Sequence, residues 1–282
     1  MGLAKISAPR DSRGEMSSPP LVLLGCGYTL TRLALARPKD SRTLAVTGNP
    51  ERRARLQAHG VSVVTEAEAL AHGEGAHVVV SLPPEAGRDV QVAQALASLR
   101  PARLVYLSST GVYGTRSGEV DEQTPVEPEA PQAIGRLAAE ALYRPLGGVV
   151  LRVAGIYGPG RGLHQRLQAG TFRLPGEGSR RTSRIHVDDL VSAIEVALAR
   201  AAPGSVLCVA DAAPVPLREV VEWLCVRLSL PPPPSIPLEA APPTLRGDRA
   251  VRARALEALG WQPAFPTWRE GFEAVFAEEA VV

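Results

Sequence analysis

The stretch 21–33, LVLLGCGYTLTRL, predicts a strand, a glycine turn and a helix in immediate succession. In a Gly-x-Gly-x-x-Gly turn, the first glycine allows the tight turn and the second lets the backbone approach a pyrophosphate. The third lets helix and strand pack closely. Gly25 and Gly27 stand at the first two positions and Leu30 stands at the third. We expect Leu30 to push the helix off the strand, or to swing outward at a small packing cost, without removing the phosphate contact.

Strand-like and helix-like stretches alternate along the chain, which predicts βαβ units and a parallel sheet. The strand-like stretches are continuously apolar, as in strands buried on both faces. They predict an α/β fold: a Rossmann-type doubly wound parallel sheet with a small C-terminal substrate lobe. We expect strands at 21–24, 43–47, 61–64, 78–82, 103–107, 148–153 and 205–210, and helices at 29–37, 51–59, 90–99, 133–143, 188–200 and 216–228.

The pattern loosens after Tyr157, where loops rich in glycine and proline begin. Small lobes of this kind usually lie over the carboxyl ends of the strands, where ligands bind. The polar, aperiodic N-terminal residues predict a disordered tail, with Met16 as an alternative start of translation. The expected division is a tail at 1–20, a dinucleotide-binding domain at 21–157 and 184–212, and a substrate lobe at 158–183 and 213–282.

Charge and cysteine content argue against several classes of function. The formal net charge is +2 with both signs interspersed, so we expect no nucleic-acid partner. No apolar run is long enough to cross a bilayer and no signal-peptide core is present, so we expect no membrane partner. Three widely spaced cysteines argue against disulfides and a zinc site. We therefore expect no metal and a reducing, cytoplasmic location.

The residues after the second expected strand bear on the cofactor. A carboxylate is expected there for the ribose of NAD, but the sequence over 47–53 is TGNPERR. Small polar residues followed by arginines suit a 2′-phosphate, so the sequence favours NADP over NAD. The alternative is that Arg52 and Arg53 are solvated helix residues.

Several motifs follow in order: LVLLGCGY, LVYLSSTGVYG, EQTPVEP, GRLAAEAL, LRVAGIYGPGR, SRIHVDDL and LGWQPAFPTWREG. Over residues 21–275 this succession resembles the extended and atypical short-chain dehydrogenase/reductases, the NAD-dependent epimerase/dehydratase group. The resemblance implies NAD(P) across the strand ends, a small polar or nucleotide-linked, sugar-like substrate, and a homodimer that the alanine-rich helix 133–143 could form. The implied cofactor positions are Gly25, Gly27, Tyr28, Thr29, Leu30, Thr47, Asn49, Arg52, Leu82 and Pro83.

The resemblance also implies where the catalytic groups stand. Ser109 takes the position of the family's catalytic serine, which hydrogen-bonds a substrate hydroxyl or carbonyl; alternatively it only satisfies backbone groups where the strand ends. The family's proton-donating tyrosine and the lysine four residues later fall at Gln132 and Arg136. Gln132 cannot titrate, and Arg136 keeps its charge at any working pH.

The Tyr-x-x-x-Lys unit is absent from the entire sequence. Lys5 and Lys39 are the only lysines, and both precede every tyrosine except Tyr28. Arg32 stands four residues after Tyr28. An atypical branch of the resembled family lacks the same unit.

Other side chains in these motifs are candidates for the substrate side. Tyr113 and Tyr157 are expected either to face the nicotinamide or to pack at the strand ends. Arg184 matches a family position that often faces a substrate phosphate. His186 is either an acid–base group or a hydrogen-bonded loop histidine. Asp188 is interpreted as a helix N-cap. Three more basic residues either add charge to the same cleft or lie on the surface: Arg161, His164 and Arg166.

Three functions remain open from the sequence. The first is an NAD(P)-dependent oxidoreductase or epimerase-like enzyme whose acid–base pair is replaced by Gln132 and Arg136. The second is a non-catalytic NAD(P)-binding sensor or partner-binding module. The third is a relic of the fold that binds no dinucleotide, with Leu30 as its symptom.

Overall fold

A computed structural model describes residues 19–281 of the chain. The expected tail at 1–20 and the alternative start at Met16 lie outside the described residues, apart from positions 19 and 20. Within the described part, no helix is both long and apolar enough to cross a bilayer.

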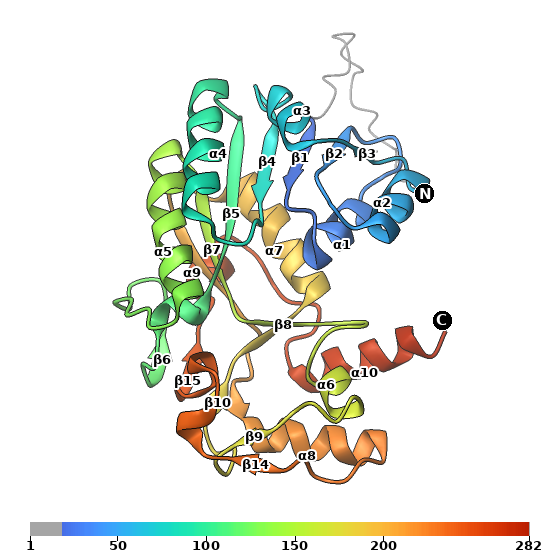
Figure 1. Cartoon of the computed structure of the whole chain (residues 1–282), viewed down its shortest axis with the longest axis vertical. Helices are drawn as coiled ribbons and strands as arrows, with labels where there is room; N and C mark the ends of the chain where they lie inside the picture. Colours follow the sequence, from blue (N-terminus) through green and yellow to red (C-terminus); the bar gives the residue numbers. More distant parts are fainter. Residues whose placement is uncertain (1–18, 282) are drawn as a thin grey trace, which may run out of the picture.

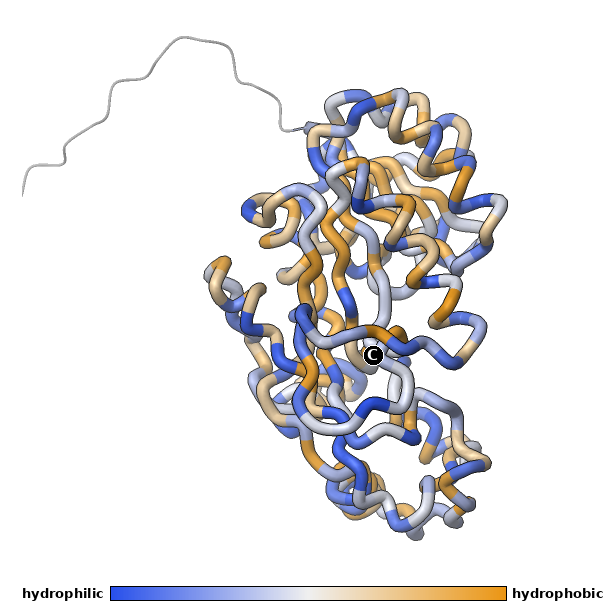
Figure 2. The backbone as a smooth tube through the Cα atoms, turned by 90° about the vertical axis from the view of Figure 1, so that its left-hand side faces the viewer, coloured by the Kyte–Doolittle hydropathy of each residue, from blue (hydrophilic) through white to orange (hydrophobic). Residues whose placement is uncertain are grey.

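Seven parallel strands form the central sheet in the larger part of the molecule (Figure 1). Their order, β12-β7-β5-β4-β1-β2-β3, starts in the middle and winds outward in both directions, which confirms the predicted doubly wound sheet. Figure 2 shows apolar residues running along these inner segments, as burial on both faces requires. The strands are β1 (Leu21–Leu24), β2 (Thr43–Ala45), β3 (Ser62–Val63), β4 (His77–Val80), β5 (Arg103–Ser109), β7 (Val149–Val153) and β12 (Val206–Val209).

Helices cover both faces of the sheet. One core contains residues of α1 (Tyr28–Ala36), α2 (Pro50–Ala58), α7 (Val187–Arg200) and α9 (Arg254–Ala258), and the other contains residues of α3 (Glu66–Ala71), α4 (Ala86–Leu99) and α5 (Pro131–Tyr143). The sequence interpretation missed α3. Its capping box, in which Thr65 and Glu68 bond reciprocally, is a signal that could have found it.

A smaller lobe lies beyond the carboxyl ends of the sheet strands (Figure 1). Its core packs Tyr157, Phe272 and Trp268 with neighbouring apolar side chains. Its helices are α6 (Leu163–Gln168), α8 (Leu217–Leu228) and α10 (Trp268–Glu279). Two-stranded pairs complete the fold: β8 (Gly155–Tyr157) with β11 (Arg184–His186), β9 (Leu174–Pro175) with β14 (Ser235–Ile236), β10 (Arg181–Thr182) with β13 (Val215–Pro216), and β6 (Gly118–Val120) with β15 (Arg249–Val251).

Two features bear on the predicted boundaries. β5 runs two residues further than predicted because Ser108 and Ser109 pair with Arg152 and Val153 of β7. The segment around Leu256 and Trp261 packs against the sheet beside α7, although the predicted division places it in the lobe. The division into domains, and the homodimer through α5, stay predictions.

Leu30 does not swing outward, so that part of the prediction is wrong. Its side chain is fully buried, and it belongs to the same core cluster as Leu21, Leu23 and Leu33. A larger residue than glycine is therefore accommodated between α1 and the sheet. Leu30 contributes to stability, and a glycine there would leave a void.

We expect Leu30→Ala to lower the free energy of unfolding by about 2–5 kcal/mol, because it removes fully buried methyl groups and leaves a cavity. Urea denaturation followed by circular dichroism measures the change. The matched control is Val226→Ala on α8, whose side chain is exposed; it should change stability by less than about 0.5 kcal/mol. Equal effects of the two substitutions would contradict a packing role for Leu30.

Candidate functional site

The turn between β1 and α1 is tightly packed, and it leaves the first amide groups of α1 open to a ligand. Gly25 has a φ of +78°, and a Cβ there would lie 2.9 Å from the backbone N of Leu82. Gly27 is the N-cap of α1, and no side chain caps the first turn, which also lacks an acidic residue. The first amide groups of α1 are thus available to an anion. The predicted cofactor positions Thr29, Leu30, Thr47 and Leu82 are buried.

A pocket of about 510 Å³ lies beside this turn, between α1 and α2. Three of the predicted positions line it, namely Tyr28, Asn49 and Arg52. Asn49 also caps α2, accepting a hydrogen bond from the Arg52 amide at 2.8 Å. Arg55 lines the pocket although the sequence did not single it out, whereas Arg53 is exposed and does not line it. Arg55 lies three residues after Arg52, and residues with this spacing share one face of a helix. This spacing could have identified Arg55 from the sequence.

Arg32 links three segments at the edge of this α1–α2 pocket. Its guanidinium donates to both carboxylate oxygens of Asp188, at 2.6 and 2.9 Å, and to those of Glu278, at 2.6 and 2.8 Å. The predicted N-cap role of Asp188 is wrong. His186 is the N-cap of α7, and its Nδ1 accepts from the Asp188 amide at 3.3 Å.

Ser109, Gln132 and Arg136 come together in a second pocket, here called the strand-end pocket, of about 630 Å³. Pro83 joins them from the loop after β4. Ser109 Oγ accepts from the Gly111 amide at 3.1 Å, so the hydroxyl hydrogen remains available. Gln132 is exposed at this pocket. The three catalytic positions that the sequence motifs imply therefore line one pocket.

Arg136 is held by the ends of two strands. Its Nη1 donates to the carbonyl oxygens of Leu82 and Leu107, both at 2.9 Å, and to the Tyr106 hydroxyl at 3.2 Å. One nitrogen of the guanidinium therefore ties α5 to β5 and to the loop after β4. The rest of the group, which lines the strand-end pocket, keeps further donors.

Tyr113 does not face this pocket as a substrate-binding residue would; of its two predicted alternatives, the structure shows packing near the strand ends. It is fully buried, and its hydroxyl donates to the carbonyl oxygen of Asp121 at 2.7 Å. Burial raises the pKa of this phenol above its usual value. The hydroxyl also accepts from Arg152, which forms a buried ion pair with Glu140 at 2.8 Å. Tyr113 belongs to a polar network behind the site.

Two further pockets continue from the strand-end pocket. The middle pocket, of about 230 Å³, shares Ser109, Gly111 and Thr244 with it. The arginine pocket, of about 540 Å³, shares Gly155, Thr182, Ser183 and Leu245 with the middle pocket. The three pockets therefore adjoin one another from the strand ends at Ser109 into the smaller lobe, and together they are called the groove.

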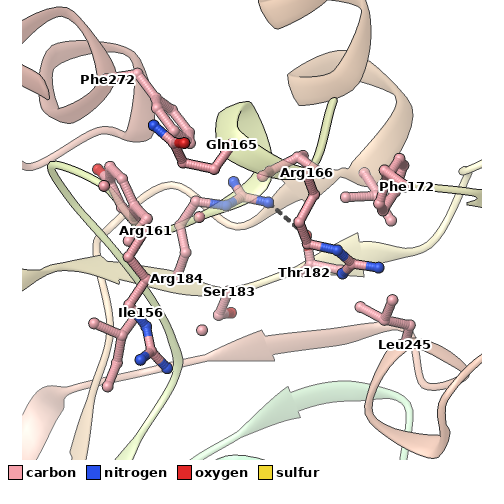
Figure 3. Close-up of a pocket in the computed structure, with 16 residues that line it drawn as sticks. Ile156, Arg161, Gln165, Arg166, Phe172, Thr182, Ser183, Arg184, Leu245 and Phe272 are labelled. Atoms are coloured by element: carbon pink, nitrogen blue, oxygen red, sulfur yellow. Dashed lines mark hydrogen bonds between the residues drawn. The ribbon is translucent and has the colours of Figure 1, made fainter. Parts of the chain in front are cut away.

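Figure 3 shows the arginine pocket, into which Arg184 projects from β11. Arg184 is 8% exposed; its Nη2 donates to Thr182 Oγ1, while its Nη1 has no hydrogen-bond partner among the described residues. Arg161 and Arg166 line the same pocket and are exposed. The Tyr157 hydroxyl at its wall is also unpartnered within the described chain. Burial raises the pKa of Tyr157 above its usual value.

The two predicted histidines do not line the groove. His186 packs edge-on against Tyr157 and Phe265, and burial lowers the pKa of its imidazole. His164 is fully buried, with Nε2 3.2 Å from a carboxylate oxygen of Glu279. It neither lines the cleft nor lies on the surface, so both of its predicted locations are wrong.

Asp211 is a buried carboxylate that the sequence analysis did not single out. It follows β12, and its amide donates to the carbonyl oxygen of Arg184 at 2.8 Å. No side chain among the described residues hydrogen-bonds its carboxylate, which only the Ala213 backbone approaches. Burial raises its pKa to about 7, outweighing the lowering effects of Arg184 and of the Ala213 backbone.

Comparisons with known proteins place these features in a wider setting. Residues 85–210, which include Ser109, Gln132, Arg136 and Arg184, match the sequence model of the NAD dependent epimerase/dehydratase family. The chain is 34% identical over 177 residues to a 3-diazoavenalumate denitrifying reductase of Streptomyces sp, covering 54% of this chain and 57% of the reductase. It is 32% identical over 196 residues to a UDP-glucose 4-epimerase of Mycolicibacterium smegmatis, covering 62% of this chain and 61% of the epimerase.

The chain thus spans 57% and 61% of the length of these curated relatives. A solved structure matches over nearly its whole length. It is described as a functionally unknown conserved protein from Silicibacter pomeroyi DSS, with a TM-score of 0.78 and 31% identity. The match covers 93% of this chain and 99% of that protein.

The raised pKa of Asp211 predicts a pH-dependent stability. The folded protein holds this proton more tightly than the unfolded chain, whose aspartate titrates near its ordinary value of 3.8. Stability contributed by the protonated carboxyl is therefore lost as the pH rises from about 4 to about 7. We expect Asp211→Asn to gain stability relative to the native protein over this window, by up to roughly 4 kcal/mol.

Urea unfolding at several pH values measures this difference. Glu222→Gln, at an exposed carboxylate on α8, is the control for loss of a carboxylate, and its stability difference should depend less on pH than that of Asp211→Asn. A pH dependence of the Asp211→Asn difference no larger than that of the control would contradict the raised pKa of Asp211.

Proposed function

Because the chain belongs to the NAD-dependent epimerase/dehydratase family, we propose that it is an NAD(P)-binding oxidoreductase or epimerase-like enzyme with an atypical active site. The observation that carries the proposal is the groove from Ser109, Gln132 and Arg136 to the buried Arg184. The strand-end pocket offers room for the reacting nicotinamide ring, and the arginine pocket offers room for an anion.

The proposed cofactor runs along the carboxyl edge of the sheet. Its diphosphate meets the free amide groups in the first turn of α1, its adenosine end enters the α1–α2 pocket, and its nicotinamide end lies by Pro83 and Ser109. Arg52 and Arg55 line the adenosine end, which favours the 2′-phosphate of NADP. When bound, the cofactor supplies hydride transfer.

The proposed substrate is nucleotide-linked and sugar-like, as in the related UDP-glucose 4-epimerase. Its phosphates lie against Arg184, with Arg161 and Arg166 at the mouth. Apolar side chains in the same pocket, including Phe172 and Leu245, offer contacts for a base. Its sugar reaches Ser109 through the middle pocket.

The groups at the reacting end orient and polarise the substrate. Ser109 donates its free hydroxyl hydrogen to a substrate oxygen, and Gln132 adds a neutral hydrogen bond. Neither is a general acid near neutral pH, and loss of such a group costs about 10²–10⁴-fold in rate. Arg136 supplies a fixed positive charge.

The second candidate function is a non-catalytic NAD(P)-binding sensor or partner-binding module. The position of Arg136 favours it, since Nη1 is spent on the carbonyl groups of Leu82 and Leu107. A hydride-exchange assay with nucleotide sugars decides between the two. Exchange that Ser109→Ala abolishes supports the enzyme. A silent native protein that becomes active on joint Gln132→Tyr and Arg136→Lys substitution supports the sensor.

We expect NADPH to raise the melting temperature, because a ligand that binds only the folded state stabilises it. Arg52→Ala should weaken NADPH binding about tenfold or more while leaving NADH binding nearly unchanged, since only NADPH carries the 2′-phosphate. Nicotinamide fluorescence measures both affinities.

Arg53→Ala is the matched control, because Arg53 is an exposed neighbour that does not line the pocket. Equal losses for NADH and NADPH in Arg52→Ala would remove the preference for NADP. No response to either nucleotide would overturn the proposed cofactor site and favour the relic.

A further inference from the structure

A buried positive charge and a buried negative charge lie close together behind the arginine pocket without forming an ion pair. The backbone amide of Asp211 donates to the carbonyl oxygen of Arg184, yet no hydrogen bond joins the two side chains within the described structure. Among groups of opposite charge, Asp211 has the largest effect on the pKa of Arg184, and Arg184 has the largest effect on the pKa of Asp211. Among the described residues, Nη1 of Arg184 has no hydrogen-bond partner, and the carboxylate of Asp211 has no side-chain partner and is approached only by the Ala213 backbone. Arg184 is nine-tenths buried and projects into the pocket.

Such an arrangement offers Arg184 two alternative counter-ions. In the empty pocket, at a pH where Asp211 is ionised, its charge compensates the buried guanidinium, since an uncompensated buried charge is costly. A phosphate on Nη1 would supply the compensation itself. Asp211 would then be a second anion beside the same cation, in a setting where repulsion is poorly screened.

The charged groups around Asp211 do not relieve that repulsion. Asp189 of α7 and the Tyr157 hydroxyl of β8 are the other titratable groups facing it, and neither is a cation. Glu219 of α8 faces Arg184, and Glu270 of α10 faces Tyr157, each adding negative charge. The remaining cations of the pocket, Arg161 and Arg166, are exposed to water.

We propose that Asp211 couples anion binding to proton uptake: a phosphate-bearing ligand occupies Arg184 together with a proton on Asp211. This inference rests on the proposed anion site at Arg184 and adds its regulation. Asp211 acts through Arg184 and is a positioning residue. The site holds its anion more tightly as the pH falls, although the charge of the ligand stays constant. The raised pKa of Asp211, about 7, places this coupled binding of a proton and an anion near neutral pH.

UDP-glucose is a suitable probe because its diphosphate diester does not titrate between pH 6 and pH 8. Isothermal titration calorimetry in two buffers of different ionisation enthalpy counts the protons taken up on binding. We expect uptake of a fraction of a proton approaching one at pH 8, and an affinity about tenfold weaker at pH 8 than at pH 6. Asp211→Asn should show no uptake and an affinity independent of pH.

Two further variants separate the possible failures. Glu219→Gln also removes a carboxylate that acts on Arg184, but an exposed one, and should keep the native proton uptake. Arg184→Met should lose the ligand at every pH. Binding that depends on Arg184 but proceeds without proton uptake by the native protein overturns the inference and leaves the anion site standing.

If the native protein binds neither UDP-glucose nor inorganic sulfate at any pH, the anion site and the inference both fall. If Asp211→Asn keeps the native uptake, another group takes the proton and the inference is wrong. The native measurement alone decides whether uptake occurs, so the test does not depend on the folding of any variant.

Discussion

A parallel sheet that is buried on both faces can present polar groups only at the ends of its strands. That constraint organises the whole molecule. The strands are continuous apolar runs between two helical layers, so hydroxyl, amide and guanidinium groups gather at the carboxyl edge and in the lobe beyond it. Ser109 ends β5, Arg184 begins β11, and Asp211 follows β12. The groove is where these ends meet.

The few polar groups inside the layers stabilise this edge. Arg152 and Glu140 form an ion pair between β7 and α5, and both are almost fully buried. Ser108 donates to the same carboxylate at 2.5 Å, and Arg152 also reaches the Tyr113 hydroxyl. With its hydrogen bonds satisfied, such a network fixes the register of α5 against β5 and β7. The serine next to Ser108 is thereby held at the groove.

The fold was predictable because periodicity and glycine placement are local signals. The doubly wound sheet, its strands and most helices followed from apolar runs. The motif spacing also brought together Ser109, Gln132 and Arg136. The sequence could not say which side chains face inward. The side chains of Tyr113 and His186 are buried. Asp211 could not be recognised from the sequence, because its raised pKa depends on the neighbours that bury it. Asp188 was misassigned because its carboxylate bonds Arg32, far away in the sequence.

The contact of Arg32 with Asp188 and Glu278 has a consequence for how the α1–α2 pocket behaves in different solutions. The ion pairs join α1, α7 and α10, segments that the chain separates by up to 246 residues, and their side chains are partly exposed. Dissolved salt weakens attractions between exposed charges, most strongly where the charges lie further apart than the Debye length of about 8–10 Å. The contact of α1 with α7 and α10 at the edge of this pocket is therefore expected to be somewhat stronger in dilute buffer than in concentrated salt.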